Sequence, residues 1–198
     1  MKNNLIIKAI IYINEKNPSN HLPYHGIDHL YSVYEMCNKI VYSDKNYRDL
    51  DKKDELFIAA LFHDFNHSGG KLTDAENISN AILGCNDFLD TIENTLDRDL
   101  IHEIIRATQY PAIIDKKDLD DYQKIIQDAD MCYLFTDLSI VKLYCGLRSE
   151  FNQDLKIFLD NQMNFFNSLS FNTEYCNNLW YNLKNKRIAE LQLLKDNI

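Results

Sequence analysis

Residues 56–65 read LFIAALFHDF, and this stretch decides how the rest of the chain has to fold. Its first seven positions are apolar in every direction around a helix, which is typical of a helix buried on all sides. A His-Asp pair, His63 and Asp64, follows directly. An ionised carboxylate in such surroundings is costly unless it is paired or bound to a metal ion, so this pair is the first candidate for a functional site.

The chain around this segment predicts an all-α fold. It has 198 residues, 45% of them hydrophobic, with only five Gly and three Pro, which suits one domain with a sizeable core and disfavours a turn-rich β fold. Because no repeat or linker interrupts it, we expect a compact single-domain helical bundle over residues 1–198. Helical periodicity predicts helices at about 3–15, 27–43, 50–65, 74–90, 97–108, 118–136, 137–147, 150–168 and 173–195.

Charge and cysteine usage narrow the classes of function. A net charge of −9 with dispersed basic residues lacks the footprint of a protein that binds a nucleic-acid polymer. The five cysteines form no CxxC pair and are expected to be buried thiols in a reducing compartment. The start of the chain predicts a first helix rather than a signal peptide, and no apolar run reaches the roughly 20 residues of a membrane span. These features predict a soluble, cytoplasmic protein of open oligomeric state.

Two histidines extend an apolar stripe. Val33, Met36 and Ile40 lie on one face of the predicted helix 27–43. His29 and then His25 fall on the same face when that stripe is continued towards the N-terminus. Both imidazoles are therefore predicted to point to the core side.

Two aspartates in residues 125–134 are assigned different faces by the same reasoning. Ile126 and Ala129 mark the inward face of this helix, and Asp130 falls on it. Asp128 points to the opposite side. Periodicity thus predicts that Asp130 is a buried acid and that Asp128 is an ordinary surface charge.

Three predicted helices therefore bring ionisable groups inward. Each group alone is more often a core histidine, a helix cap or a salt-bridge partner, but one divalent cation would satisfy all of them. Imidazole plus carboxylate suits Zn²⁺, Mn²⁺, Fe or Mg²⁺. The pattern favours a metal centre built from His25, His29, His63, Asp64 and Asp130.

These residues resemble the H…HD…D signature of the HD-domain metal-dependent phosphohydrolases, an all-helical family. The local contexts are similar to those of class I cyclic-nucleotide phosphodiesterases. Residues 24–29, YHGIDH, resemble their YHNxxH motif, and residues 63–69, HDFNHSG, resemble HDxxHPG. Residues 104–108 and 74–78 are similar to their Ala-Thr and Leu-Glu-Asn-His segments. The resemblance covers about 22–135, and helices at about 150–195 would complete the pocket.

The resemblance implies one or two divalent ions, of unspecified identity among Zn, Mn, Mg and Fe. The first ion would be held by four ligands, and one of them, Asp64, would bridge to a second, more hydrated ion. The four implied ligands are His29, His63, Asp64 and Asp130.

Further residues acquire roles only through the resemblance. His67, Glu76 and Thr108 would contact waters on the second ion, and His25 would be the general acid that protonates the leaving oxygen. Each of the first three has an alternative: His67 as a loop histidine, Glu76 as part of a helix-capping box, and Thr108 as a helix cap.

Substrate recognition is the least determined part. Gln162 and Phe165 match the Q-x-x-F spacing with which phosphodiesterases clamp a base, but they also lie in an aromatic-rich stretch typical of a core. Gly26 stands where the motif has Asn, Ser68 stands where it has Pro, and the chain is short beyond Asp130. These departures bear on the substrate rather than on the metal chemistry.

The resemblance implies hydrolysis of a phosphoester of a small nucleotide, foremost a 3′,5′-cyclic nucleotide, by a metal-activated water with a His general acid. An HD-family nucleotide monophosphatase or alarmone hydrolase is one alternative. A non-catalytic nucleotide-binding module with a structural metal is another.

Overall fold

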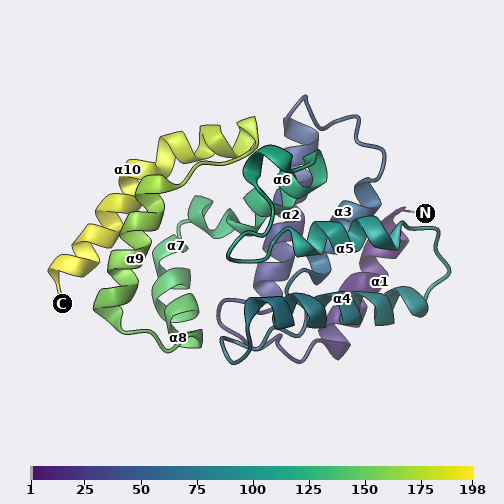
Figure 1. Ribbon diagram of the computed structural model, residues 1–198, viewed down its shortest axis with the longest axis horizontal. Coiled ribbons are helices and arrows are strands. Elements are labelled where there is room, and N and C mark those ends of the chain that lie inside the picture. Colours follow the sequence, from purple (N-terminus) through teal and green to yellow (C-terminus); the bar gives the residue numbers. More distant parts are fainter. Residues whose placement is uncertain (1) are drawn as a thin grey trace.

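The computed structural model describes residues 2–198, and it confirms the all-α prediction, since no strand occurs in that range (Figure 1). The longer helices are α1 (Lys2–Lys16), α2 (Ile27–Ser43), α3 (Lys53–Phe62), α4 (Asp74–Asp90), α5 (Arg98–Arg106), α6 (Asp121–Asp130), α9 (Leu155–Ser168) and α10 (Glu174–Asp196). Short turns lie between them: η1 (Lys116–Asp118), η2 (Cys132–Phe135), α7 (Ser139–Val141), the π-helical η3 (Lys142–Leu147) and α8 (Arg148–Glu150).

Helix α3 is the centre of the fold. Every residue from Glu55 to Phe62 is buried, as the all-round apolar sequence predicts. Helices α1, α2, α4 and α5 pack around it, and α6 closes the ring against α2, α3 and α5 (Figure 1). This arrangement brings the C-terminal end of α3, where His63 and Asp64 follow, next to α2 and α6.

The second part of the chain is more broken than its periodicity predicts. The expected helix 118–136 ends at Asp130 and continues as the short turn η2. The expected helix 150–168 begins only at Leu155, because Asn152 takes a left-handed conformation with φ of 47° and the Asp154 side chain then caps α9. Helices α9 and α10 pack along each other, and α10 joins the pair to η2, α7 and α2 (Figure 1).

The prediction that Asp128 is a surface charge is wrong. Its side chain is buried at the junction between α6 and the start of α10. The backbone N–H groups of Asn172 and Thr173 donate to its carboxylate at 2.9 and 2.7 Å, and the Thr173 hydroxyl donates at 2.8 Å. The segment leading into α10 covers the outer side of α6, so this helix has no solvent face at that point.

Four of the five cysteines are buried thiols, and Cys145 is exposed. Burial raises the pKa of Cys85 to about 12, so that thiol stays protonated at neutral pH. Within residues 2–198, no helix has the combination of length and hydropathy that crossing a bilayer requires.

Candidate metal centre

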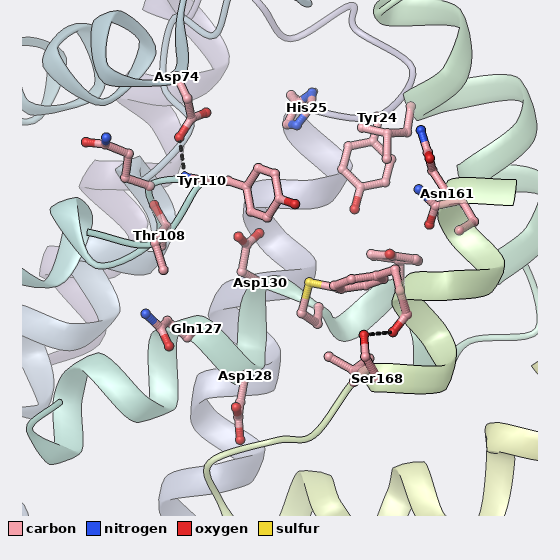
Figure 2. Close-up of a pocket in the computed structure, with 18 of the residues that line it drawn as sticks. Tyr24, His25, Asp74, Thr108, Tyr110, Gln127, Asp128, Asp130, Asn161 and Ser168 are labelled. Atoms are coloured by element: carbon pink, nitrogen blue, oxygen red, sulfur yellow. Dashed lines mark hydrogen bonds between the residues drawn. The ribbon is translucent and has the colours of Figure 1, made fainter. Parts of the chain in front are cut away.

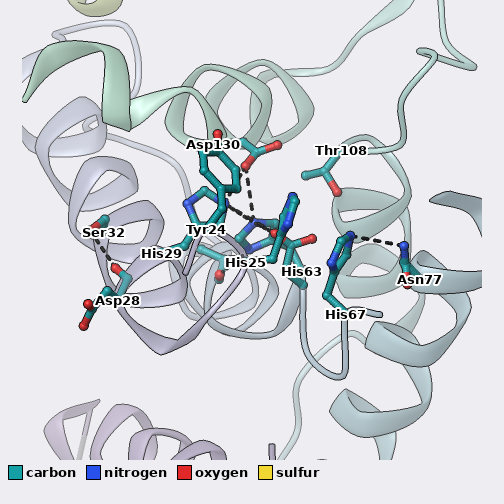
Figure 3. Close-up of polar contacts among 12 residues, drawn as sticks. Tyr24, His25, Asp28, His29, Ser32, His63, His67, Asn77, Thr108 and Asp130 are labelled. Atoms are coloured by element: carbon teal, nitrogen blue, oxygen red, sulfur yellow. Dashed lines mark hydrogen bonds and ion pairs between the residues drawn. The ribbon is translucent and has the colours of Figure 1, made fainter. Parts of the chain in front are cut away.

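Three helix ends bring four side chains to one point (Figure 3). His29 lies in the first turn of α2, His63 and Asp64 directly follow α3, and Asp130 is the last residue of α6. The Nε2 atom of His29 lies 3.0 Å from Asp130 Oδ1 and 3.3 Å from Asp64 Oδ2. The Nε2 atom of His63 lies 3.2 Å from Asp64 Oδ2 and 3.4 Å from Asp130 Oδ1.

These spacings fit a single divalent cation. Ligands at about 2.0–2.1 Å from a tetrahedral ion are separated from one another by about 3.3–3.4 Å. The two Nε2 atoms of His29 and His63 are 3.3 Å apart, and all four ligand atoms lie within 4.8 Å of one another. The donor set of two imidazoles and two carboxylates balances two negative charges against a 2+ ion. The four residues could therefore hold a metal ion without rearrangement.

The surroundings already orient the imidazoles for this role. Nδ1–H of His63 donates to the Ala60 carbonyl at 2.8 Å, which leaves Nε2 directed at the carboxylates. Burial by itself lowers the pKa of His63, but the carboxylates of Asp64 and Asp130 outweigh it and raise that pKa to about 10. Burial likewise lowers the pKa of His29, but the hydrogen bonds that its ring donates to the Asp130 and Asp64 carboxylates outweigh burial and hold that pKa well above its usual value. The site is a strongly negative pocket that favours cations.

His25 lies beside the four ligands, with its ring centroid 6.1 Å from that of His29. Its Nδ1 atom lies 2.5 Å from Glu150 Oε2. The other oxygen of Glu150 accepts hydrogen bonds from the backbone N–H groups of Tyr24 and His25, at 2.5 and 3.1 Å. The Glu150 side chain is only 2% exposed, so this carboxylate is a buried anchor for the His25 ring.

His67 lies against a face of the His25 ring. The two rings are stacked, with centroids 3.7 Å apart and planes inclined at 26°. Burial, reinforced by His25, lowers the pKa of His67 to about 4, so its imidazole is neutral at physiological pH. Although His25, His67 and Glu150 are close enough to share an ion, the lone pairs of an imidazole lie in its plane, and stacked rings present their faces instead.

The remaining residues with implied roles divide into two groups. Thr108 lines a cavity that extends from the four ligands towards α9, and its hydroxyl donates to the Ile105 carbonyl at 2.8 Å, as a helix cap does. Glu76 is exposed and does not face the cavity, because it completes the capping box of α4: its carboxylate accepts from the Thr73 N–H at 2.8 Å. The acid of this turn that does line the cavity is Asp74, which accepts a hydrogen bond from the Tyr110 N–H at 2.6 Å.

A cavity of about 930 Å³ opens from the candidate metal centre towards α9 (Figure 2). Gln162 and Phe165 both line it, and Gln162 Oε1 is buried with no hydrogen-bond partner in residues 2–198. None of the described lining residues is Lys or Arg. The wall instead carries seven side-chain amides, from Gln109, Gln127, Gln153, Asn161, Gln162, Asn164 and Asn172.

Sequence reasoning missed two of these residues. Asp74 lies in residues 74–78, but in the resemblance of this segment to Leu-Glu-Asn-His the matching acid is Glu76. Glu150 carries no sequence signal, since its partner His25 lies 125 residues earlier.

Comparison with known proteins identifies no relative of this chain. No protein-family model matches the chain, and no curated protein is significantly similar to it.

Proposed function

We propose that the protein is a metal-dependent phosphohydrolase that cleaves the phosphodiester bond of a small nucleotide, foremost a 3′,5′-cyclic nucleotide. The observation that carries this proposal is that two groups of side chains lie next to each other at the end of one cavity, which Asp64, Asp130 and His25 line. One is the four-residue ligand set of His29, His63, Asp64 and Asp130, and the other is the His25–Glu150 pair. Phosphoester hydrolysis can use a cation to activate water and a positioned imidazole to protonate the leaving oxygen.

The electrostatics of the cavity favour a substrate with one phosphate. Alarmones and nucleoside polyphosphates carry several negative charges, which proteins usually neutralise with Lys or Arg. The described lining residues include no such side chain and do include Asp64, Asp74, Asp128 and Asp130. A cyclic phosphodiester carries a single negative charge, which a bound cation can offset. The lining amides offer both donors and acceptors, which suits an uncharged nucleobase.

In this proposal His25 supplies the proton that the leaving oxygen needs. Because Nδ1 of His25 is paired with Glu150, Nε2 is the ring nitrogen that can hold a proton and deliver it. Glu150 is nearly inaccessible to solvent, and its charge stabilises the protonated imidazole. A divalent ion in the adjacent site would polarise the phosphoryl group and activate a water molecule.

The test begins with metal analysis of the purified protein. The same sample is then assayed with Mn²⁺ or Mg²⁺ against cyclic mononucleotides, nucleoside 5′-monophosphates and guanosine tetraphosphate. We expect one or more ions per chain and release of a nucleoside monophosphate from a cyclic substrate. The Asp130→Asn variant, assayed in parallel, should lose that activity, which excludes a contaminating phosphodiesterase.

Two results contradict the proposal. Turnover of guanosine tetraphosphate or of monophosphates without turnover of any cyclic diester would identify one of the other HD-family reactions. Bound metal together with tight nucleotide binding, and no turnover of any phosphoester, would identify a binding module.

A further inference from the structure

The contacts of His67 differ from those of a side chain directed at a hydrated ion. His67 is 5% exposed, and each of its ring nitrogens lies against a neighbouring polar group. The Gly69 backbone nitrogen lies 3.1 Å from Nδ1, and the side-chain amide nitrogen of Asn77 lies 3.1 Å from Nε2 (Figure 3). Because a neutral imidazole accepts at only one nitrogen, one of these contacts is a hydrogen bond and the other is close packing. To contact a water on an ion, His67 would have to give up one of these partners.

The two partners fix the His67 ring to a rigid part of the fold. Asn77 is buried in α4, and its Oδ1 accepts a hydrogen bond from the Ser68 N–H at 3.0 Å. One amide side chain thus holds both the histidine ring and the loop that follows it. What His67 leaves free is a ring face, and that face is the one stacked on His25 at 3.7 Å.

We propose that His67 is a positioning residue for His25, acting as a buried platform under its ring, and not a group that contacts waters on a second ion. This inference rests on the proposed function, in which His25 delivers a proton. Glu150 holds the edge of the His25 ring through Nδ1, and His67 holds its face. Two constraints from different directions leave Nε2 with one orientation, which proton delivery to a fixed leaving oxygen requires.

The platform role and the metal role respond differently to two substitutions. His67→Phe keeps an aromatic face under His25 but has no nitrogen for a water, whereas His67→Ala removes the face as well. We expect metal content to equal that of the wild type in both variants. His67→Ala should lower kcat by about 10–100-fold with a smaller change in KM, and His67→Phe should lower kcat distinctly less.

The accessibility of the His25 ring can also be measured directly, without an activity assay. The rate at which diethylpyrocarbonate modifies His25 is measured by mass spectrometry, with the exposed His21 as internal reference. Removing the platform in His67→Ala should raise that rate several-fold, and His67→Phe should keep it near the wild-type value. If His67→Ala does not fold, Asn77→Ser keeps both rings while loosening His67, and it should also raise the rate.

The inference is overturned if His67→Phe loses as much kcat as His67→Ala, or if both variants bind one ion fewer per chain than the wild type. An unchanged modification rate of His25 in His67→Ala or Asn77→Ser also overturns it. These outcomes differ from failure of the proposed function, in which the wild type itself hydrolyses no cyclic diester while the modification rates still report on the platform.

Discussion

The Nδ1 atom of His25 and the Oε2 atom of Glu150 lie 2.5 Å apart, joined across 125 residues of sequence. Glu150 ends the short helix α8, which follows the π-helical turn η3. Burial by itself raises the pKa of Glu150, but its hydrogen bonds with His25 and with the Tyr24 and His25 backbone outweigh it and lower that pKa. The carboxylate is therefore ionised at neutral pH and lies beside the His25 ring.

We expect Glu150→Gln to lower kcat by about 10–100-fold, because a neutral amide cannot stabilise the protonated ring of His25. Metal content should stay at the wild-type level, since Glu150 is not one of the four ligands. Steady-state kinetics and elemental analysis check both expectations. Glu35→Gln, the same change at an exposed position of α2, is the matched control and should behave as the wild type. Full activity in Glu150→Gln would mean that Glu150 has no part in the proposed delivery of a proton by His25.

Asp130→Asn should weaken metal binding by more than about 100-fold, because it removes one ligand and one negative charge from the centre. Titration of the chelator-treated protein with Mn²⁺, followed by calorimetry, measures the change. Undiminished Mn²⁺ affinity would mean that the ion is held elsewhere.

Asp128→Asn should show the reverse pattern two residues away. The Asp128 carboxylate accepts hydrogen bonds from Asn172 and Thr173, and an amide would turn its own donor towards some of theirs. We expect the free energy of unfolding to fall by about 1–3 kcal/mol, with metal affinity retained. Urea denaturation with and without Mn²⁺ distinguishes the two aspartates, and metal loss in this variant would show that α6 is positioned by the α10 junction.

Gly26→Ala should destabilise the entry to α2. A Cβ at position 26 would lie 2.2 Å from the Leu22 carbonyl oxygen and 3.0 Å from that of Asn20. Because backbone atoms cannot move aside cheaply, we expect a loss of about 1–3 kcal/mol in urea denaturation. Gly146→Ala, whose Cβ would come no closer than 3.2 Å to its neighbours, is the control and should cost less. The same contacts predict that Asn at position 26 would also destabilise this chain.

The stability of the protein should depend on pH through His67. Burial is the main cause that lowers its pKa from 6.5 to about 4; His25 acts in the same direction, while Asp64 and Glu150 oppose it. The folded state therefore favours the neutral ring, and the stabilisation is complete above pH 6.5. It should be lost as the pH falls from 6.5 towards 4, by about 3 kcal/mol.

Urea denaturation across this range, in a chelator, measures the effect as the difference between wild type and His67→Phe, which has no titrating ring. A pH-independent difference between the two proteins would mean that His67 accepts a proton as easily when folded as when unfolded.

Helical periodicity was sufficient for the fold class and for the central helix, because a segment that is apolar all round has to be surrounded by other helices. It also grouped His29, His63, Asp64 and Asp130, which do lie together, but it placed His25 in the same group, and the ring of His25 pairs with Glu150 instead. It failed at Asp128, because α6 is covered on two sides and periodicity distinguishes faces only when one of them meets solvent.

The remaining features depended on tertiary structure. The carboxylate of Glu76 is used in the capping box at the start of α4, so it does not face the cavity. Asp74, two residues earlier, lines the cavity instead. The partners of His25 come from a loop 42 residues later and a short helix 125 residues later, at His67 and Glu150. The sequence alone indicated which residues could bind a cation, through the apolar segments around them and the order of short motifs. Only the packing of distant segments decided which side chains hold the His25 ring, since no local pattern records a contact between residues so far apart.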